Sequence, residues 1–337
     1  MELGEYLKEV RERADSYERT IQFMIAFDSA VRWDDRQRRY IEDSHFLPCR
    51  RLTKNIAGSN AHITPDIVIQ LSSRYGIIAE VKITASSDQD FTKAYQQIVN
   101  YDSDLIGWKT KNEKIDLHDL ALLVNDLKKN VALKFFGDKT FQRKFNLVAC
   151  ARISESKEFC KIEKYHGAFS DTRIESKLRD PVAIPLEAII GDVSGVKFYD
   201  VEPPVEYTMN VIWMNALNEI KQKGGSEKGK MILVECSELT GMLQERYSFC
   251  QLDSRQPKIP REAWVREALD TFVAIKYAKE DPGNDDRYYI KYSYPRKEDM
   301  LEFFSRKNFE NQNKKSLKVE QLKLEFESTR SKSPKQN

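Results

Sequence analysis

The segment "TPDIVIQLSSRYGIIAEVKIT", residues 64–84, places three charged side chains, Asp66, Glu80 and Lys82, within two short apolar runs. The two runs predict neighbouring strands, joined by the polar turn between them. Side chains alternate along a strand, so Glu80 and Lys82 point the same way. If the strand beginning at Asp66 pairs alongside, its carboxyl group lies close to that of Glu80.

Two adjacent carboxylates repel, and each raises the pKa of the other unless a cation lies between them. Mg²⁺ suits such a pair because it prefers oxygen ligands and is commonly completed by water and substrate phosphate. The pair therefore predicts a site for Mg²⁺, or for Mn²⁺, beside the ammonium group of Lys82. Such a site can polarise a phosphodiester and activate water.

The chain after this segment alternates between helices and strands. Ser87 followed by Asp90 is a capping-box pattern that predicts a helix start. A strand at 120–124, a basic helix at 127–136 and another strand at 145–149 come next. This alternation is typical of an α/β sheet, and apolar spacing in residues 1 to about 44 predicts helices before it.

Pro203-Pro204 is the best candidate for a domain boundary, since adjacent prolines interrupt helices and sheets. Beyond it, helices at 205–223 and 237–247, a helix opening at Pro260 and an aromatic hairpin resemble a winged helix-turn-helix module. We therefore expect an α/β domain at 1–202, a winged-helix-like α+β domain at 203–297, and a basic tail at 298–337, helical and then disordered.

The pattern Pro65-Asp66 followed by Glu80-Val81-Lys82 resembles the PD-(D/E)xK nuclease superfamily. This resemblance implies a restriction-endonuclease-like mixed sheet flanked by helices, with the acidic residue and the E-x-K on adjacent strands. In the following helix, Gln97 and Tyr101 resemble the Q-x-x-x-Y element of the RecB-like branch.

The resemblance also implies roles for individual residues. Asp66, Glu80 and the carbonyl of Val81 would hold the metal, while Lys82 would assist the attacking water. Gln97 and Tyr101 would orient the substrate. The iron–sulfur cluster of some RecB-like nucleases is not expected, because the five cysteines are scattered without the required spacing.

The superfamily often supplies one more ligand from the first helix or from the segment before the first strand. Glu42, His45 and His62 all stand in that part of the sequence. The sequence leaves the three open, with Glu42 favoured because a carboxylate suits Mg²⁺.

Basic residues predict where nucleic acid binds. Net positive segments run from Arg36 to Lys54 and from Lys128 to Lys144. The residues expected to contact nucleic acid are Arg50, Arg51, Lys93, Arg261 and Arg266. Residues 206–296, however, hold equal numbers of basic and acidic side chains, so dimerisation or protein binding suits the second domain equally well.

Composition narrows the class of protein. Apolar residues make up 40% of the chain and no run is long enough to cross a bilayer. The charged amino terminus has no apolar signal core, so we expect a cytoplasmic protein with no membrane partner.

Together these observations predict a metal-dependent nuclease that hydrolyses DNA, in restriction or defence or in recombination repair. We expect a homodimer, because one site per chain cuts only one strand of a duplex. The alternative is a non-catalytic DNA-binding regulator that keeps the α/β domain as a scaffold and recognises DNA through the winged helix.

Overall fold

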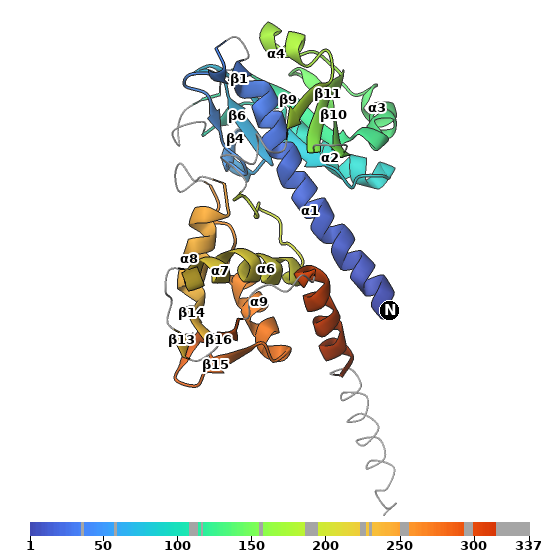
Figure 1. Cartoon of the computed structure of the whole chain (residues 1–337). Helices are drawn as coiled ribbons and strands as arrows, with labels where there is room; N and C mark the ends of the chain where they lie inside the picture. The colour runs from blue at the N-terminus through green and yellow to red at the C-terminus, as the bar shows by residue number, and fades with distance from the viewer. Residues whose placement is uncertain are drawn as a thin grey trace, which may run out of the picture. The chain divides into compact units, whose positions relative to one another are not determined.

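The computed structural model describes residues 1–34, 37–56, 59–107, 114–115, 117–154, 158–185, 195–222, 227–228, 231–249, 256–292 and 299–314. The chain groups into two compact units (Figure 1). The larger unit contains residues 16–201 and 244–259, and the smaller unit contains residues 1–15, 202–243 and 260–337. Each unit is described by itself.

This grouping differs from the contiguous ranges expected from the sequence. The first turns of α1 (Leu3–Arg32) group with the smaller unit, where the hydroxyl of Tyr6 donates to the carboxylate of Glu206. Residues 244–259 return to the larger unit, where the ring of Phe249 stacks edge-on against Phe46 at 5.5 Å. The units change between residues 201 and 202, next to the expected boundary at Pro203-Pro204, and contacts between residues distant in sequence exchange the two further segments. The tail beyond 314 lies outside the described residues.

A seven-stranded mixed sheet forms the larger unit, in the order β12-β11-β10-β9-β7-β6-β3. Its centre, β7, β9 and β10, is parallel, and its outer strands are antiparallel. The strands are β3 (His45–Phe46), β6 (Ile67–Gln70), β7 (Tyr75–Lys82), β9 (Leu117–Asn125), β10 (Phe145–Ser154), β11 (Glu158–His166) and β12 (Val182–Pro185). A smaller sheet holds β4 (Leu52–Ile56), β5 (Ser59–Ile63) and β8 (Leu105–Ile106), and β1 (Trp33–Asp34) pairs with β2 (Arg39–Tyr40).

The described helices of this unit are residues 16–32 of α1, α2 (Asp88–Tyr101), α3 (Lys129–Phe136) with the short 3₁₀ turn Asp126–Lys128 before it, and α4 (Thr172–Lys177). The predicted start of α2 is confirmed. The Ser87 hydroxyl accepts from the backbone of Asp90, whose carboxylate accepts from the backbone of Ser87, so the capping box is complete.

Residues 33–34 and 37–44, which helical spacing predicts as part of a helix, form two short paired strands and turns instead. The helix ends at Arg32, and the next segment contains Arg38 and Asp43 at positive φ. A non-glycine residue rarely adopts positive φ, and never within a right-handed helix. Tight turns, rather than a second helix, therefore lead into β3.

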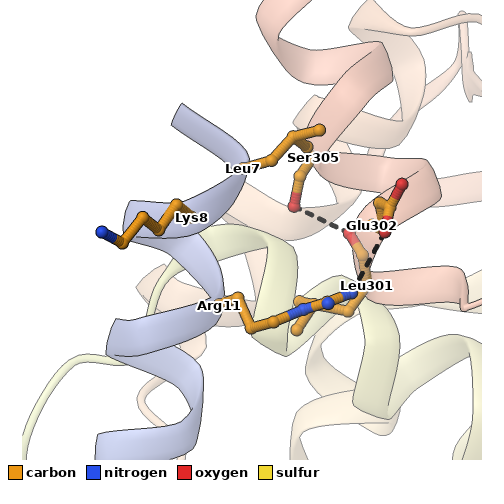
Figure 2. A pocket seen from close by; sticks show the side chains of 6 residues that line it. All are labelled: Leu7, Lys8, Arg11, Leu301, Glu302 and Ser305. Atoms are coloured by element: carbon orange, nitrogen blue, oxygen red, sulfur yellow. Dashed lines mark hydrogen bonds and ion pairs between the residues drawn. The ribbon is translucent and has the colours of Figure 1, made fainter. Parts of the chain in front are cut away.

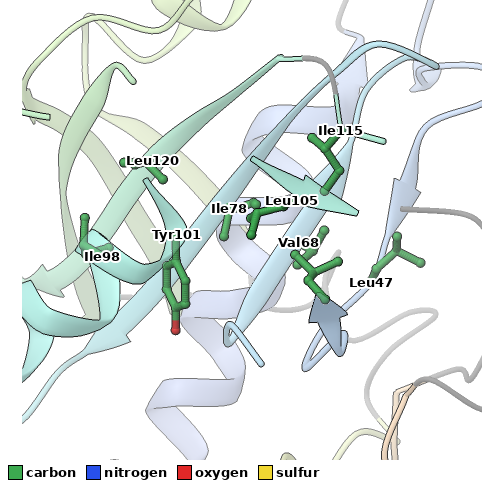
Figure 3. Close-up of a cluster of buried hydrophobic side chains, with 9 residues drawn as sticks. Leu47, Val68, Ile78, Ile98, Tyr101, Leu105, Ile115 and Leu120 are labelled. Atoms are coloured by element: carbon green, nitrogen blue, oxygen red, sulfur yellow. The ribbon is translucent and has the colours of Figure 1, made fainter. Parts of the chain in front are cut away.

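Two apolar clusters join α2 to the sheet. The first lies between the end of α2 and strands β6, β7 and β9 (Figure 3). The second packs α2 and α3 on the sheet through Phe91, Ala94, Phe136 and Leu122. Because Leu122 is the register partner of Glu80, α2 and α3 lie over the face of the sheet from which Glu80 projects.

The smaller unit has a four-stranded antiparallel sheet, in the order β13-β14-β16-β15. Its elements are α6 (Val205–Val211), a π-helical turn (Ile212–Ala216), α7 (Leu217–Gln222), β13 (Glu227–Lys228), β14 (Met231–Glu235), α8 (Cys236–Arg246), α9 (Glu262–Ala274), β15 (Ala278–Asp281), β16 (Asn284–Lys291) and a helix at 300–314. Trp213 packs at the centre against Phe272 and Phe304.

The protein is therefore mixed α/β, with a large mixed sheet and flanking helices, as the sequence predicts. None of the helices in the described part of the chain is both long and apolar enough to cross a membrane.

Candidate functional site

The two carboxyl groups predicted to converge do so at one end of the β6–β7 ladder. The ladder begins with Ile67 opposite Ala79, which places Asp66 opposite Glu80. The expected strand start at Asp66 is one residue early, since β6 begins at Ile67. The Asp66 carboxylate accepts from the backbone N–H of Val81 at 2.8 Å. It thus accepts a hydrogen bond that a backbone carbonyl of the neighbouring strand would accept in a regular ladder.

Glu80 is 2% exposed, and three side chains donate to its carboxylate. The Lys82 ammonium and the Gln97 amide each donate to Oε1 at 2.7 Å. The Tyr101 hydroxyl donates to Oε2, also at 2.7 Å. Figure 3 shows the Tyr101 ring as a member of the apolar cluster, with its hydroxyl pointing away from the other side chains. The structure thus brings together all five residues predicted as catalytic.

The surroundings of the Asp66 carboxyl group shift its pKa. Loss of surrounding water, and then the charge of Glu80, raise its pKa well above the ordinary value, although Lys82 and the Val81 N–H act in the opposite direction. Without another cation, Asp66 therefore holds its proton more tightly than a free aspartate does.

Lys82 remains charged. Burial alone lowers the pKa of its ammonium, but the carboxylates of Glu80 and Asp66 outweigh burial and raise that pKa above its ordinary value. Lys82 can therefore donate hydrogen bonds and offset negative charge at neutral pH, but it cannot accept a proton there.

Three residues that the sequence did not indicate also border the pair. The N–H of Cys49, a residue at positive φ, donates to the Asp66 carbonyl at 3.0 Å. Burial, and then the charge of Asp66, raise the pKa of the Cys49 thiol, to which the backbone of Asp200 donates. Burial also raises the pKa of the Tyr199 hydroxyl, and the negative charges of Asp66 and Glu80 raise it further. No motif marks these residues.

The three candidates for a further metal ligand lie elsewhere. The side chain of Glu42 is 79% exposed and pairs with Arg39 at 3.5 Å. His45 pairs with Gln70, at the opposite end of β6 from Asp66. His62 lies on β5, where its ring contacts the Thr53 hydroxyl at 3.2 Å. None of these partners belongs to the Asp66–Glu80 pair, so a further ligand from this segment stays a prediction.

The residues predicted to contact nucleic acid fall into two groups. Arg51 and Lys93 are exposed. Arg50, in contrast, is 1% exposed and donates to the Gly107 carbonyl at 3.3 Å, so its guanidinium is not presented to a phosphate. Arg36, within the first basic segment, lies outside the described residues.

In the smaller unit, Arg261 lies over the Trp264 ring at 5.3 Å. Arg266 pairs with both Glu262 and Asp286 at 2.9 Å. Cys236 joins these two carboxylates in a group with ligand atoms within 4.8 Å of one another. Because Arg266 already pairs with both carboxylates, we interpret the group as an ion-pair cluster.

A separate pocket of about 280 Å³ lies in the smaller unit (Figure 2). Its lining residues are Leu7, Lys8, Arg11, Leu301, Glu302 and Ser305. Arg11 is paired with Glu302 at 3.1 Å, and the Ser305 hydroxyl donates to the Leu301 carbonyl. These polar groups bond to one another, so the pocket presents no convergent reactive set.

The donor set at Asp66 and Glu80 fits a hard divalent ion. Two carboxylates that resist joint ionisation gain most from a cation, and oxygen ligands are those that Mg²⁺ and Mn²⁺ prefer. Comparison with family models, with curated proteins and with solved structures finds no match to this chain. The geometry of the site is therefore the ground for a functional proposal.

Proposed function

We propose that the protein is a metal-dependent nuclease of the PD-(D/E)xK, RecB-like type, with a restriction-endonuclease-like larger unit that hydrolyses DNA phosphodiester bonds. One observation carries the proposal. Asp66, Glu80, Lys82, Gln97 and Tyr101, which form one motif set in the sequence, converge through short hydrogen bonds on one end of a sheet.

Asp66 and Glu80 would hold Mg²⁺ or Mn²⁺, with the Val81 carbonyl as a further oxygen donor. When bound, the ion would supply Lewis-acid polarisation of the phosphodiester and of the attacking water. Lys82 stays protonated, so its part is to offset the negative charge that develops on the phosphate. Gln97 and Tyr101 fix the orientation of the Glu80 carboxylate.

The smaller unit resembles a winged helix. Helix α6 with α7, strand β14, helices α8 and α9, and the hairpin β15–β16 follow one another, and the sheet order is β14-β16-β15. A recognition helix needs basic residues, but α9 contains three acidic side chains against the single, ion-paired Arg266. This charge favours a protein-contacting role and speaks against the alternative of a non-catalytic regulator that reads DNA through α9.

The proposal is tested by incubating the purified chain with linear, circular and single-stranded DNA in Mg²⁺, in Mn²⁺ and in EDTA. We expect cleavage that requires the metal and that falls by a factor of about 10³ or more in the variants Asp66→Asn and Glu80→Gln, since each removes a metal ligand. Comparison of the three substrates separates endonuclease from exonuclease action.

The matched control is Asp180→Asn, which changes an exposed carboxylate of the same unit. We expect this variant, and Glu42→Gln, to cleave as the parent chain does. Metal-dependent cleavage that survives both Asp66→Asn and Glu80→Gln contradicts the assignment of the site.

A further inference from the structure

One apolar side chain lies far outside the core of the larger unit. Leu127, in the 3₁₀ turn before α3, is 86% exposed, more than any other large apolar residue in the described part of the chain. Val131, one helical turn later, is also exposed. Exposing a leucine to water is unfavourable by up to about 2 kcal/mol relative to burial, so packing inside the unit does not account for it.

The sheet places Leu127 at the same end as the candidate site. Strands β7 and β9 are parallel, with Glu80 beside Leu122 and Lys82 beside Val124. Leu127 therefore stands three residues beyond the register partner of Lys82. The carboxyl ends of parallel strands share one edge of a sheet, which is where substrates of α/β proteins commonly bind.

The turn that carries Leu127 is held in place at both ends. The Asn125 side chain accepts from the backbone N–H of Leu127 at 3.0 Å. The Asp126 carboxylate pairs with Lys129 at 2.9 Å, and Lys129 also approaches Glu163 at 3.6 Å. Leu127 is thus presented on an anchored turn.

Basic side chains follow this apolar tip along the chain, in the same turn, in α3 and just beyond α3. Lys128 and Lys134 form no ion pair with any residue that the structure describes, and Lys134 is exposed. The ammonium of Lys139 lies over the rings of Tyr95 and Phe135 at 5.3 and 5.4 Å and is also exposed. An apolar tip followed by cations suits a groove of DNA, where phosphates border stacked bases.

We propose that Leu127 is a wedge that enters a groove of the substrate DNA and loosens a base step beside the scissile phosphate. Lys128, next to Leu127, and Lys134, on α3, contact nearby phosphates in this arrangement. The inference rests on the proposed nuclease function and adds to it the element that deforms the duplex, a role that depends on an apolar side chain as well as on charge.

The test uses the full chain carrying Asp66→Asn, so that bound DNA stays intact. A duplex containing 2-aminopurine, whose fluorescence increases when the base unstacks, is scanned position by position, and affinity is measured by fluorescence anisotropy at several salt concentrations. We expect binding to raise the fluorescence at one or two adjacent positions.

Adding Leu127→Ala should abolish that rise and weaken affinity by about tenfold, with an unchanged salt dependence. Adding Leu127→Met should retain both signals. The matched control is Leu117→Ala, a leucine 46% exposed at the opposite end of β9. Lys134→Ala should instead reduce the salt dependence. Circular dichroism checks that all variants fold.

The outcomes separate the two levels of inference. Duplex binding in which Leu127→Ala and Leu117→Ala give equal fluorescence and affinity overturns the wedge and leaves the nuclease proposal intact. Failure of the Asp66→Asn chain to bind any DNA overturns both. Binding of the parent to anionic vesicles that Leu127→Ala abolishes, with DNA binding unaffected, assigns the tip to a membrane surface and also overturns the wedge.

Discussion

Glu80 illustrates how the fold tolerates a buried charge. A carboxylate removed from water is strongly destabilising unless donors surround it. Lys82 comes from the same strand, while Gln97 and Tyr101 come from α2, four residues apart and so on one helical face. Three donors on two elements replace the lost water and fix the orientation of the carboxylate.

The Tyr101 hydroxyl is a measurable part of that arrangement. Tyr101→Phe leaves Oε2 of a buried carboxylate without its donor, so we expect the free energy of unfolding to fall by about 1–3 kcal/mol. Urea denaturation in EDTA measures the loss. Tyr95→Phe, which removes a hydroxyl from a half-buried tyrosine of the same helix that packs against Phe136 and Phe141, is the control. An equal loss in both variants contradicts the role assigned to Tyr101.

These residues also show what sequence can reveal about a site. Asp66, Glu80, Lys82, Gln97 and Tyr101 were predictable, because strand alternation and helical spacing determine which side chains share a face. Cys49, Tyr199 and Asp200 were not predictable, because they reach the pair through contacts between residues distant in sequence.

At the scale of elements, His118 connects β9 to the end of α2. Its ring is fully buried, and Nε2 lies 2.8 Å from the Tyr101 carbonyl. Burial, and then the charge of Arg143, lower the pKa of His118 to about 4. The folded protein therefore keeps this histidine neutral, and its N–H secures the carbonyl of the residue that holds Glu80.

This lowered pKa predicts a loss of stability in acid. Between the unfolded pKa of about 6.5 and the folded value of about 4, the unfolded chain binds a proton that the folded chain does not, so stability falls as the pH falls through this window. The contribution is on the order of 3 kcal/mol. We expect His118→Asn to flatten the decline measured by urea denaturation at pH 7 and pH 5.

His62, which is exposed, supplies the comparison. His62→Asn should leave the pH profile of the parent unchanged. A profile that is equally steep in His118→Asn shows that other groups cause the acid sensitivity.

Most elements with strong local signals were predictable. The capping box began α2 at the expected place, and the apolar runs gave β7 and β9 to within a few residues. The end of the helix at Arg32 was not predictable. Apolar residues keep helical spacing beyond it, and no glycine indicates the positive φ of Arg38 and Asp43.

At the scale of the whole molecule, the alternation of helices and strands predicted the α/β class. It did not predict which segments of the chain make up each of the two units. The first fifteen residues belong with residues 202–243, and 244–259 return to the larger unit. Such exchanges depend on contacts such as Tyr6 with Glu206, which leave no local pattern.

The central claim concerns a pair of carboxyl groups that one divalent ion bridges. Because Asp66 has a raised pKa, metal binding must displace its proton, so affinity should increase with pH and binding should release protons. The increase should continue until the pH exceeds the pKa of Asp66 in the metal-free protein, since above it no proton remains to be displaced.

The most direct measurement is a calorimetric titration of the chain with Mn²⁺ at several pH values, in buffers of different ionisation enthalpy. We predict one site per chain, proton release on binding, and a loss of affinity of at least about tenfold in Asp66→Asn but not in Asp180→Asn. Equal Mn²⁺ affinity in the parent chain and in Asp66→Asn would contradict the claim that Asp66 and Glu80 form a metal site.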